Sequence, residues 1–436
     1  MTLPSSRLDT AATQQTITAM NRRHFLKRSA GLVAIGAAPP AFLSRAIAAE
    51  KNDPDQRILV VVQLAGGNDG LNTVIPWVDD AYHSARPSLA FKRDTVLKIN
   101  DHIGLHPQLA GMKALYDEGA LSIIQGVGYP HPNRSHFRSM DIWNTAQPES
   151  EITGDGWLGR ALDNSAARFA GKVPALALGM DNLPLALVAP RTNVPSIRSI
   201  DDYQLRFGDV PAPDNQLRHS LARKLADGAK ERWGEAAAEP TSSDLSFIRQ
   251  TLGTAIDSAA RLKEVAASYQ PASPYPQTAL AANLKAVAQL IAGELGTRIF
   301  FVSLGGFDTH ARQAGSHAAL LAELSGAVTA FFKDLRAHGL ADRVLLATYS
   351  EFGRRLRENG SLGTDHGAGS QMFIVSGATK AGVFGDHPSL TDLDDGDLKH
   401  ATDFRSVYAT LLDRWLRIPS EPVLGGKFAP VDFLTV

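Results

Sequence analysis

Five short segments, far apart in the sequence, combine glycine with carboxylate, imidazole, hydroxyl or guanidinium side chains. They cover residues 66–72, 128–137, 305–310, 349–354 and 363–367. Carboxylates together with neutral imidazoles suit zinc, manganese and related divalent ions, whereas magnesium and calcium sites use mainly oxygen ligands. A hydroxyl beside such an ion can lose its proton near neutral pH, and an arginine can bind an oxyanion through two hydrogen bonds. The residue types therefore indicate a metal-dependent site that acts on an anionic group.

Each segment taken alone also has a purely structural explanation. Residues 66–70 read Gly-Gly-Asn-Asp-Gly, which suits a tight turn because glycine and asparagine tolerate a positive φ angle. They do not form a dinucleotide-binding fingerprint, since no G-x-G-x-x-G opens a helix there. Ser135 is equally well placed to begin a helix, and Glu351 with Arg354 could form a surface ion pair. The joint placement of the segments is what favours a functional site.

Each segment adjoins an apolar run of strand length. The predicted strands cover residues 57–64, 121–127, 173–178, 297–304, 343–348 and 371–376. Helical patterns at 107–118, within 244–295, at 316–338 and at 403–416 separate several of the strands, with Asp403 placed as an N-cap. Strands alternating with long helices predict βαβ units, hence an α/β fold with a mainly parallel central sheet flanked by helices. In such sheets the functional crevice lies beyond the carboxyl ends of the strands, so we expect all five segments at one edge.

Two further regions complete the predicted organisation. Residues 191–240 carry many charges and little periodicity, which predicts a helical or irregular insertion over one edge of the sheet; a surface excursion without function is the alternative. The mature chain, 49–436, is predicted to be a single domain that includes this insertion.

The N-terminal residues resemble an export signal. Residues 21–27 read Asn-Arg-Arg-His-Phe-Leu-Lys, similar to the twin-arginine motif, and an uncharged stretch at 29–44 precedes a small-residue cleavage site at 46–48. We therefore expect residues 1–48 to be an extension and a signal peptide, with Met1 or Met20 as the start; a basic amphipathic helix is the alternative. The mature protein is expected in the periplasm or outside the cell after passage through the twin-arginine translocase, without stable membrane insertion.

Composition excludes several classes of function. The 44 Lys and Arg residues nearly balance the 45 Asp and Glu residues, so no electrostatic argument supports a nucleic-acid partner. The absence of cysteine excludes disulfides, a thiolate nucleophile and cysteine-bound zinc or iron–sulfur centres. Any metal must therefore bind to histidine or to oxygen ligands.

The motifs together resemble an uncharacterised exported family, DUF1501, which is similar in turn to the alkaline phosphatase and sulfatase superfamily. The resemblance covers nearly the whole mature chain and includes Asp-Phe-Arg-Ser-Val-Tyr-Ala at 403–409. It implies an alkaline-phosphatase-like fold and a two-metal hydrolase with a serine or threonine nucleophile, or a formylglycine in sulfatases. By position, it implies Asp69 as the first-strand metal ligand and Ser135 as the nucleophile. It also implies that Asp308 and His310 bind one metal, although the spacing of this pair is shorter than usual.

Residues 363–367 admit two alignments to that superfamily. By residue type, Asp365 and His366 match an Asp-His pair that normally lies at the end of a strand. By position, Glu351 replaces the strand-end aspartate and His366 matches the final histidine ligand; this alignment is favoured slightly. Either alignment leaves one ligand altered, which puts a complete two-metal site in doubt. Neither sulfatase modification signal is present, because the chain lacks Cys-x-Pro-x-Arg and Ser135 is not in a Ser-x-Pro-x-Arg frame.

The leading hypothesis is an exported metal-dependent hydrolase of phosphate or sulfate esters. Ser135 would attack the ester, and Arg134 or Arg354 would bind the oxyanion. One or two zinc, manganese, magnesium or calcium ions would be held by Asp69, Asp308, His310, Glu351, Asp365 and His366. The alternative is a non-catalytic periplasmic binding or assembly protein with a degenerate site, and a weaker third possibility is other metal chemistry, redox included. The sequence does not identify the substrate, leaves His106 open and gives His317 no role.

Overall fold

The computed structural model describes residues 57–169, 173–199, 268–294 and 296–436. The predicted export signal lies outside these residues, as do most of the predicted insertion at 191–240 and much of the helical pattern at 244–295. Among the described residues, no helix is both long enough and apolar enough to cross a membrane.

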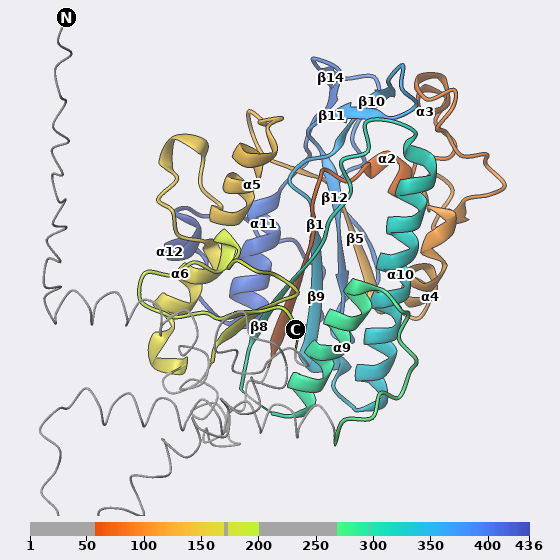
Figure 1. The fold of residues 1–436 in the computed structure, drawn as a ribbon. Helices are drawn as coiled ribbons and strands as arrows, with labels where there is room; N and C mark the ends of the chain where they lie inside the picture. Colours follow the sequence, from red (N-terminus) through yellow and green to blue (C-terminus); the bar gives the residue numbers. More distant parts are fainter. Residues whose placement is uncertain (1–56, 170–172, 200–267, 295) are drawn as a thin grey trace, which may run out of the picture.

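A mainly parallel sheet forms the centre of the fold (Figure 1). The strand order is β13 (Gly382–Phe384), β5 (Leu121–Gly128), β12 (Ser370–Val375), β9 (Val344–Tyr349), β1 (Ile58–Leu64), β8 (Ile299–Leu304), β6 (Ala175–Leu178) and β7 (Ser196–Ile197), with β16 (Thr402–Asp403) beside β5. All six strands predicted from apolar runs are confirmed, and so is the α/β class. The central strands are buried on both faces, which explains why they read as continuous apolar runs.

Strand β12 runs antiparallel to both of its neighbours, β5 and β9, a direction that the sequence analysis did not assign. Its first residue therefore lies at the edge where the parallel strands end. Residues 363–367, which precede β12, reach the same edge as the segments that follow the other strands.

Helices cover both faces of the sheet (Figure 1). Alternate residues of β1 point to opposite faces. Val60 and Val62 share an apolar core with α4 (Ala110–Asp117), α9 (Ala279–Ala292) and α10 (Gln313–Ala337). Leu59 and Val61 share the other core with α5 (His136–Thr145), α6 (Trp157–Asn164), α11 (Phe404–Ala409), its π-helical continuation Thr410–Leu416, and α12 (Glu421–Leu424).

The predicted helices at 107–118, 316–338 and 403–416 are confirmed. A short 3-10 turn, Pro107–Leu109, precedes α4. The Asp403 carboxylate accepts a hydrogen bond of 2.9 Å from the backbone N–H of Arg405, so Asp403 caps α11 as predicted.

Short elements pack over the carboxyl edge of the sheet. They are α2 (Gly70–Thr73), α3 (Asp80–Ala85), the small sheet of β2 (Val74–Ile75), β4 (Gly104–Leu105) and β3 (Leu97–Lys98), and the antiparallel pairs β10 (Arg354–Glu358) with β11 (Thr364–His366) and β14 (Leu393–Asp394) with β15 (Asp397–Leu398). The β10–β11 hairpin lies beyond the end of β1 (Figure 1).

Candidate metal centre

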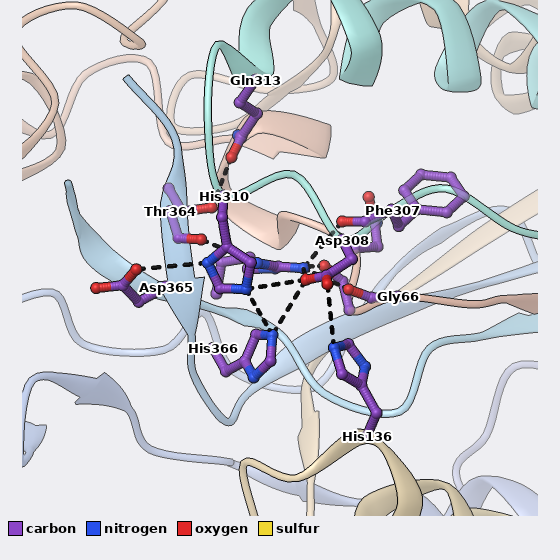
Figure 2. Close-up of polar contacts among 12 residues, drawn as sticks. Gly66, His136, Phe307, Asp308, His310, Gln313, Thr364, Asp365 and His366 are labelled. Carbon is purple, nitrogen blue, oxygen red and sulfur yellow. Dashed lines mark hydrogen bonds and ion pairs between the residues drawn. The ribbon is translucent and has the colours of Figure 1, made fainter. Parts of the chain in front are cut away.

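Three imidazoles surround the carboxylate of Asp308, just beyond the end of β8 (Figure 2). The Nε2 atoms of His310 and His366 lie 3.0 and 3.1 Å from Oδ1, and the Nε2 atom of His136 lies 3.4 Å from Oδ2. The Nε2 atoms of His310 and His366 are 2.8 Å apart. Ligand atoms of His136, Asp308 and His366 all lie within 4.8 Å of one another. Because metal–nitrogen bonds are about 2 Å long, this cluster has the dimensions of a metal site.

An oxygen atom faces the second ring nitrogen, Nδ1, of each of these imidazoles. The pairs are His136 with Glu351 Oε1 (3.0 Å), His366 with the backbone oxygen of Arg134 (2.8 Å) and His310 with Asp365 Oδ1 (3.5 Å). Since an oxygen acceptor favours a proton on Nδ1, a metal bound in the cluster would meet the Nε2 lone pair of each ring, in place of the present Nε2 contacts. Oriented imidazoles of this kind are typical of metal ligands.

The charges in the cluster also suit a cation. Burial raises the pKa of Asp308, but hydrogen bonds from His366 and Arg354 and the charge of Arg354 outweigh it and bring this pKa down to about 2. Burial lowers the pKa of His366, which favours its neutral form. An ionised carboxylate and a neutral imidazole are both suitable donors for a zinc-like ion. The Asp308 side chain is 48% exposed, so the centre is open to solvent.

Arg354 joins the loops that carry this cluster. Its side chain is buried, and its guanidinium donates hydrogen bonds to the Asp308 carboxylate (3.0 Å) and to four backbone oxygens. These oxygens belong to Gly67 (2.6 Å), Thr364 (2.9 Å), Phe307 (2.9 Å) and Gly66. Gly66 has a φ angle of 119°, and a Cβ there would collide with the backbone of Asp308. The Gly-Gly motif thus allows the loops after β1 and β8 to touch.

Arg134, the other arginine predicted to bind an oxyanion, also has carboxylate partners. Its guanidinium lies 2.8 Å from Asp397 and 3.0 Å from Asp395, around the β14–β15 turn. The guanidinium groups of Arg134 and Arg354 are therefore both occupied by groups of the protein itself.

Asp69 lies outside the cluster. It forms an ion pair of 2.6 Å with Arg86, and both side chains are fully buried. It also accepts hydrogen bonds from the backbone N–H of Asn72, as the N-cap of α2, and from the amide of Gln313. The Gln313 side-chain oxygen in turn accepts a hydrogen bond of 2.6 Å from Thr364, at the start of β11. Asp69 is thus linked to the strand that carries His366 rather than to the cluster.

Glu351 and Asp365, two more of the predicted ligands, lie behind the histidines. The buried Glu351 carboxylate accepts hydrogen bonds from the N–H of Gly66 (2.7 Å) and from His136. Asp365 is 57% exposed and accepts a hydrogen bond of 3.0 Å from Asn359. Both carboxylates contact the Nδ1 side of a ring, where they orient the imidazole.

Ser135, the predicted nucleophile, is exposed and directly precedes His136. It occupies the N-cap position of α5, but its hydroxyl makes no capping hydrogen bond. This hydroxyl is therefore not engaged in capping the helix.

His136 had no predicted role. It belongs to the polar segment 128–137, and the position of that segment after the second predicted strand was the available signal. Ser135 and His136 are adjacent at the start of a helix and point in different directions, so the sequence did not indicate which of the two faces Asp308.

A second group of polar side chains is buried beside Asp69. The Nε2 atom of His317 lies 2.9 Å from the side-chain oxygen of Asn68, and its ring contacts that of His106 edge to face. Burial lowers the pKa of each histidine to about 4, an effect that the charge of Asp69 opposes. Both rings are therefore neutral at pH 7.

This burial predicts a pH-dependent stability. The unfolded chain takes up a proton on each histidine near pH 6.5, whereas the folded chain does so only near pH 4. The free energy of unfolding should thus fall by about 1.4 kcal/mol per pH unit and per histidine as the pH drops through that interval. The His317→Gln substitution should remove one such contribution, and the exposed His102→Gln control should not. Urea unfolding of the metal-free proteins between pH 4 and 7.5 measures it; equal slopes for both variants would contradict the prediction.

The fold and the cluster together define an α/β protein with a histidine-rich candidate metal centre at the carboxyl edge of its sheet. The chain belongs to the DUF1501 family of proteins of unknown function, whose model matches residues 56–424. The resemblance drawn from the motifs is thereby confirmed. No curated protein sequence matches this chain.

Several solved structures are similar to this chain at low identity. A lipoteichoic acid synthase from Listeria monocytogenes matches with a TM-score of 0.37 and 8% identity, over 90% of this chain and 79% of that one. The C-terminal periplasmic domain of EcEptC from Escherichia coli has a TM-score of 0.34 and 10% identity, over 82% of both chains. A protein in the alkaline phosphatase superfamily from Vibrio parahaemolyticus has a TM-score of 0.31 and 8% identity, over 82% and 73%. Similarities at this level say nothing about activity.

Proposed function

We propose that this protein is a metal-dependent hydrolase of phosphate or sulfate esters. The observation that supports the proposal most is the convergence of three oriented imidazoles on the ionised carboxylate of Asp308. A divalent metal bound there would offset the charge of an ester oxyanion and would lower the pKa of a nearby hydroxyl. Residues 21–48 support export through the twin-arginine translocase to the periplasm or beyond, which remains a prediction.

The donor set favours a particular kind and number of ions. We assign His136, Asp308, His310 and His366 as the ligands, and three imidazoles with one carboxylate favour zinc or manganese over magnesium or calcium. We also propose a single ion rather than two, because the carboxylate of Asp69, the expected first-strand ligand, pairs with Arg86 outside the cluster.

Ser135 is the proposed nucleophile, and its removal provides the direct test. The Ser135→Ala variant should bind metal normally but hydrolyse aryl phosphates and aryl sulfates at least about 10³-fold more slowly, as when other hydrolases lose their nucleophile. The measurement is turnover of both ester types, with metal content determined on the same samples. Ser88→Ala, at another exposed serine, is the matched control. Undiminished turnover in Ser135→Ala would refute the assignment of the nucleophile but would not contradict the proposed metal site.

A second candidate is a non-catalytic binding or assembly protein that retains the metal centre. The observation in its favour is that the guanidinium groups of Arg134 and Arg354 are both occupied, which removes two expected oxyanion-binding groups. Metal-loaded wild-type protein that hydrolyses neither ester type would favour this candidate.

A further inference from the structure

Two exposed apolar side chains belong to segments that adjoin the proposed metal ligands. The side chains of Phe137 and Leu362 are 83% and 49% exposed, and among the described residues the only other large exposed hydrophobic side chain is that of Val436, at the end of the chain. Isolated exposed apolar residues are common on protein surfaces. The positions of Phe137 and Leu362 relative to the ligands distinguish them from such isolated residues.

Phe137 directly follows the proposed ligand His136 in the first turn of α5. Successive residues of a helix point about 100° apart. The His136 ring faces Asp308, with its Nε2 atom 3.4 Å from the carboxylate, while the Phe137 side chain points in another direction and is exposed to solvent.

Leu362 belongs to the loop between β10 and β11, which packs against His310. The next residue, Gly363, lies so close that a Cβ there would collide with the His310 carbonyl group. The Asn359 side chain ties the loop down further, because its amide donates to the His310 backbone oxygen (3.0 Å). Phe137 thus adjoins one proposed ligand in the sequence, and Leu362 belongs to a loop that contacts the backbone of another. Both ligands contact the Asp308 carboxylate.

The backbone of Leu362 is held in an unusual conformation. Its φ angle is 59°, in the left-handed region that leucine rarely adopts. The Leu362 N–H donates to the Asn359 backbone oxygen (3.2 Å), and the Leu362 oxygen accepts from the N–H of Gln313 (2.9 Å). Backbone strain of this kind persists where surrounding contacts impose it, and it is concentrated at functional sites.

We propose that Phe137 and Leu362 form an apolar rim that binds the hydrocarbon part of the ester substrate, an aryl or alkyl group. This inference rests on the proposed function and names its substrate class: a phosphate or sulfate ester of an apolar alcohol. The occupied guanidinium groups of Arg134 and Arg354 agree with it, because they leave the metal to hold the oxyanion and require affinity from other contacts.

Binding of phosphonates, which resemble the esters but are not hydrolysed, tests the rim without requiring turnover. On metal-loaded full-length protein, calorimetry should show that phenylphosphonate binds about tenfold more tightly than methylphosphonate, as expected if roughly 55 Å² of apolar surface is buried. The Phe137→Ser and Leu362→Gly substitutions together should abolish this preference and leave methylphosphonate affinity and metal content unchanged. Glycine suits the positive φ angle at position 362, so the loop should keep its shape.

Val436→Ser is the matched control, because Val436 is 50% exposed and the C-terminus lies away from the carboxyl edge (Figure 1). Equal affinity for the two phosphonates, or an unchanged preference in the double variant, would overturn the rim proposal and leave the proposed function intact. If the metal-loaded protein bound neither phosphonate, the proposed function would fail and the rim with it. A double variant that lost only binding to phosphatidylglycerol vesicles, with its phosphonate preference intact, would assign these residues to a membrane contact and overturn the proposal.

Discussion

Replacing Asp308 by asparagine is expected to remove the bound metal and to slow ester hydrolysis by about a thousandfold, equivalent to about 4 kcal/mol of activation free energy. Asp308 supplies the only carboxylate in the cluster, and it contacts the Nε2 atoms of all three histidines. Asparagine keeps the size of the side chain but removes its charge. Elemental analysis of protein purified without chelators, together with ester turnover, measures the effect.

Two other aspartate-to-asparagine substitutions provide comparisons for the metal loss expected in Asp308→Asn. Asp365→Asn should weaken metal binding by only about 10- to 100-fold, because Asp365 contacts His310 on its Nδ1 side. Asp432→Asn should change nothing, since this exposed carboxylate pairs with Lys380 and Arg414 away from the cluster. One full equivalent of metal retained by Asp308→Asn would contradict the assigned centre.

Substitutions at His136 and Asp69 distinguish the ligand set proposed from the structure from the one that the motifs imply. If His136 is a ligand, His136→Ala should lose metal. Asp69→Asn should retain metal, because the Asp69 carboxylate is committed to Arg86. The opposite pattern would favour the ligand set drawn from family resemblance.

The fold could be predicted from the sequence because strands that are buried on both faces appear as continuous apolar runs. Strands β1 and β9 are apolar at nearly every position, and the helices between strands carry their own periodicity. The direction of β12 could not be predicted, because an antiparallel strand that is buried on both faces has the same composition as a parallel one.

The edge that carries the site was predictable, but several individual roles were not. Strand ends converge by topology, which required only the order of the elements. The role of Asp69 depends instead on Arg86, which belongs to no motif. Glu351 carries the charge of a ligand, but its position behind His136 depends on packing between two loops far apart in the sequence. Residue type therefore indicated the chemistry of the site, and tertiary contacts determined which side chain faces its centre.

Arg354 shows how strongly such contacts can matter, and its removal is the second prediction with a large effect. Arg354→Leu should lower the free energy of unfolding by about 3–5 kcal/mol, the range for breaking a buried charged network. The substitution would remove one hydrogen-bond donor from each of four backbone oxygens and from Asp308. Arg354→Lys should recover only part of the loss, because one ammonium group cannot reproduce the planar guanidinium fork.

The neighbouring Arg355 provides the control for this prediction. Arg355 is 33% exposed and pairs with Asp395 and Asp397 at 3.3 and 3.4 Å, so Arg355→Leu should cost at most about 1 kcal/mol. Urea unfolding of metal-free protein measures both variants without the contribution of bound metal. Equal losses would show that Arg354 does not organise the loops. A large loss confined to Arg354, accompanied by weaker metal binding, would mean that one buried guanidinium both holds the sheet edge together and aligns the metal ligands.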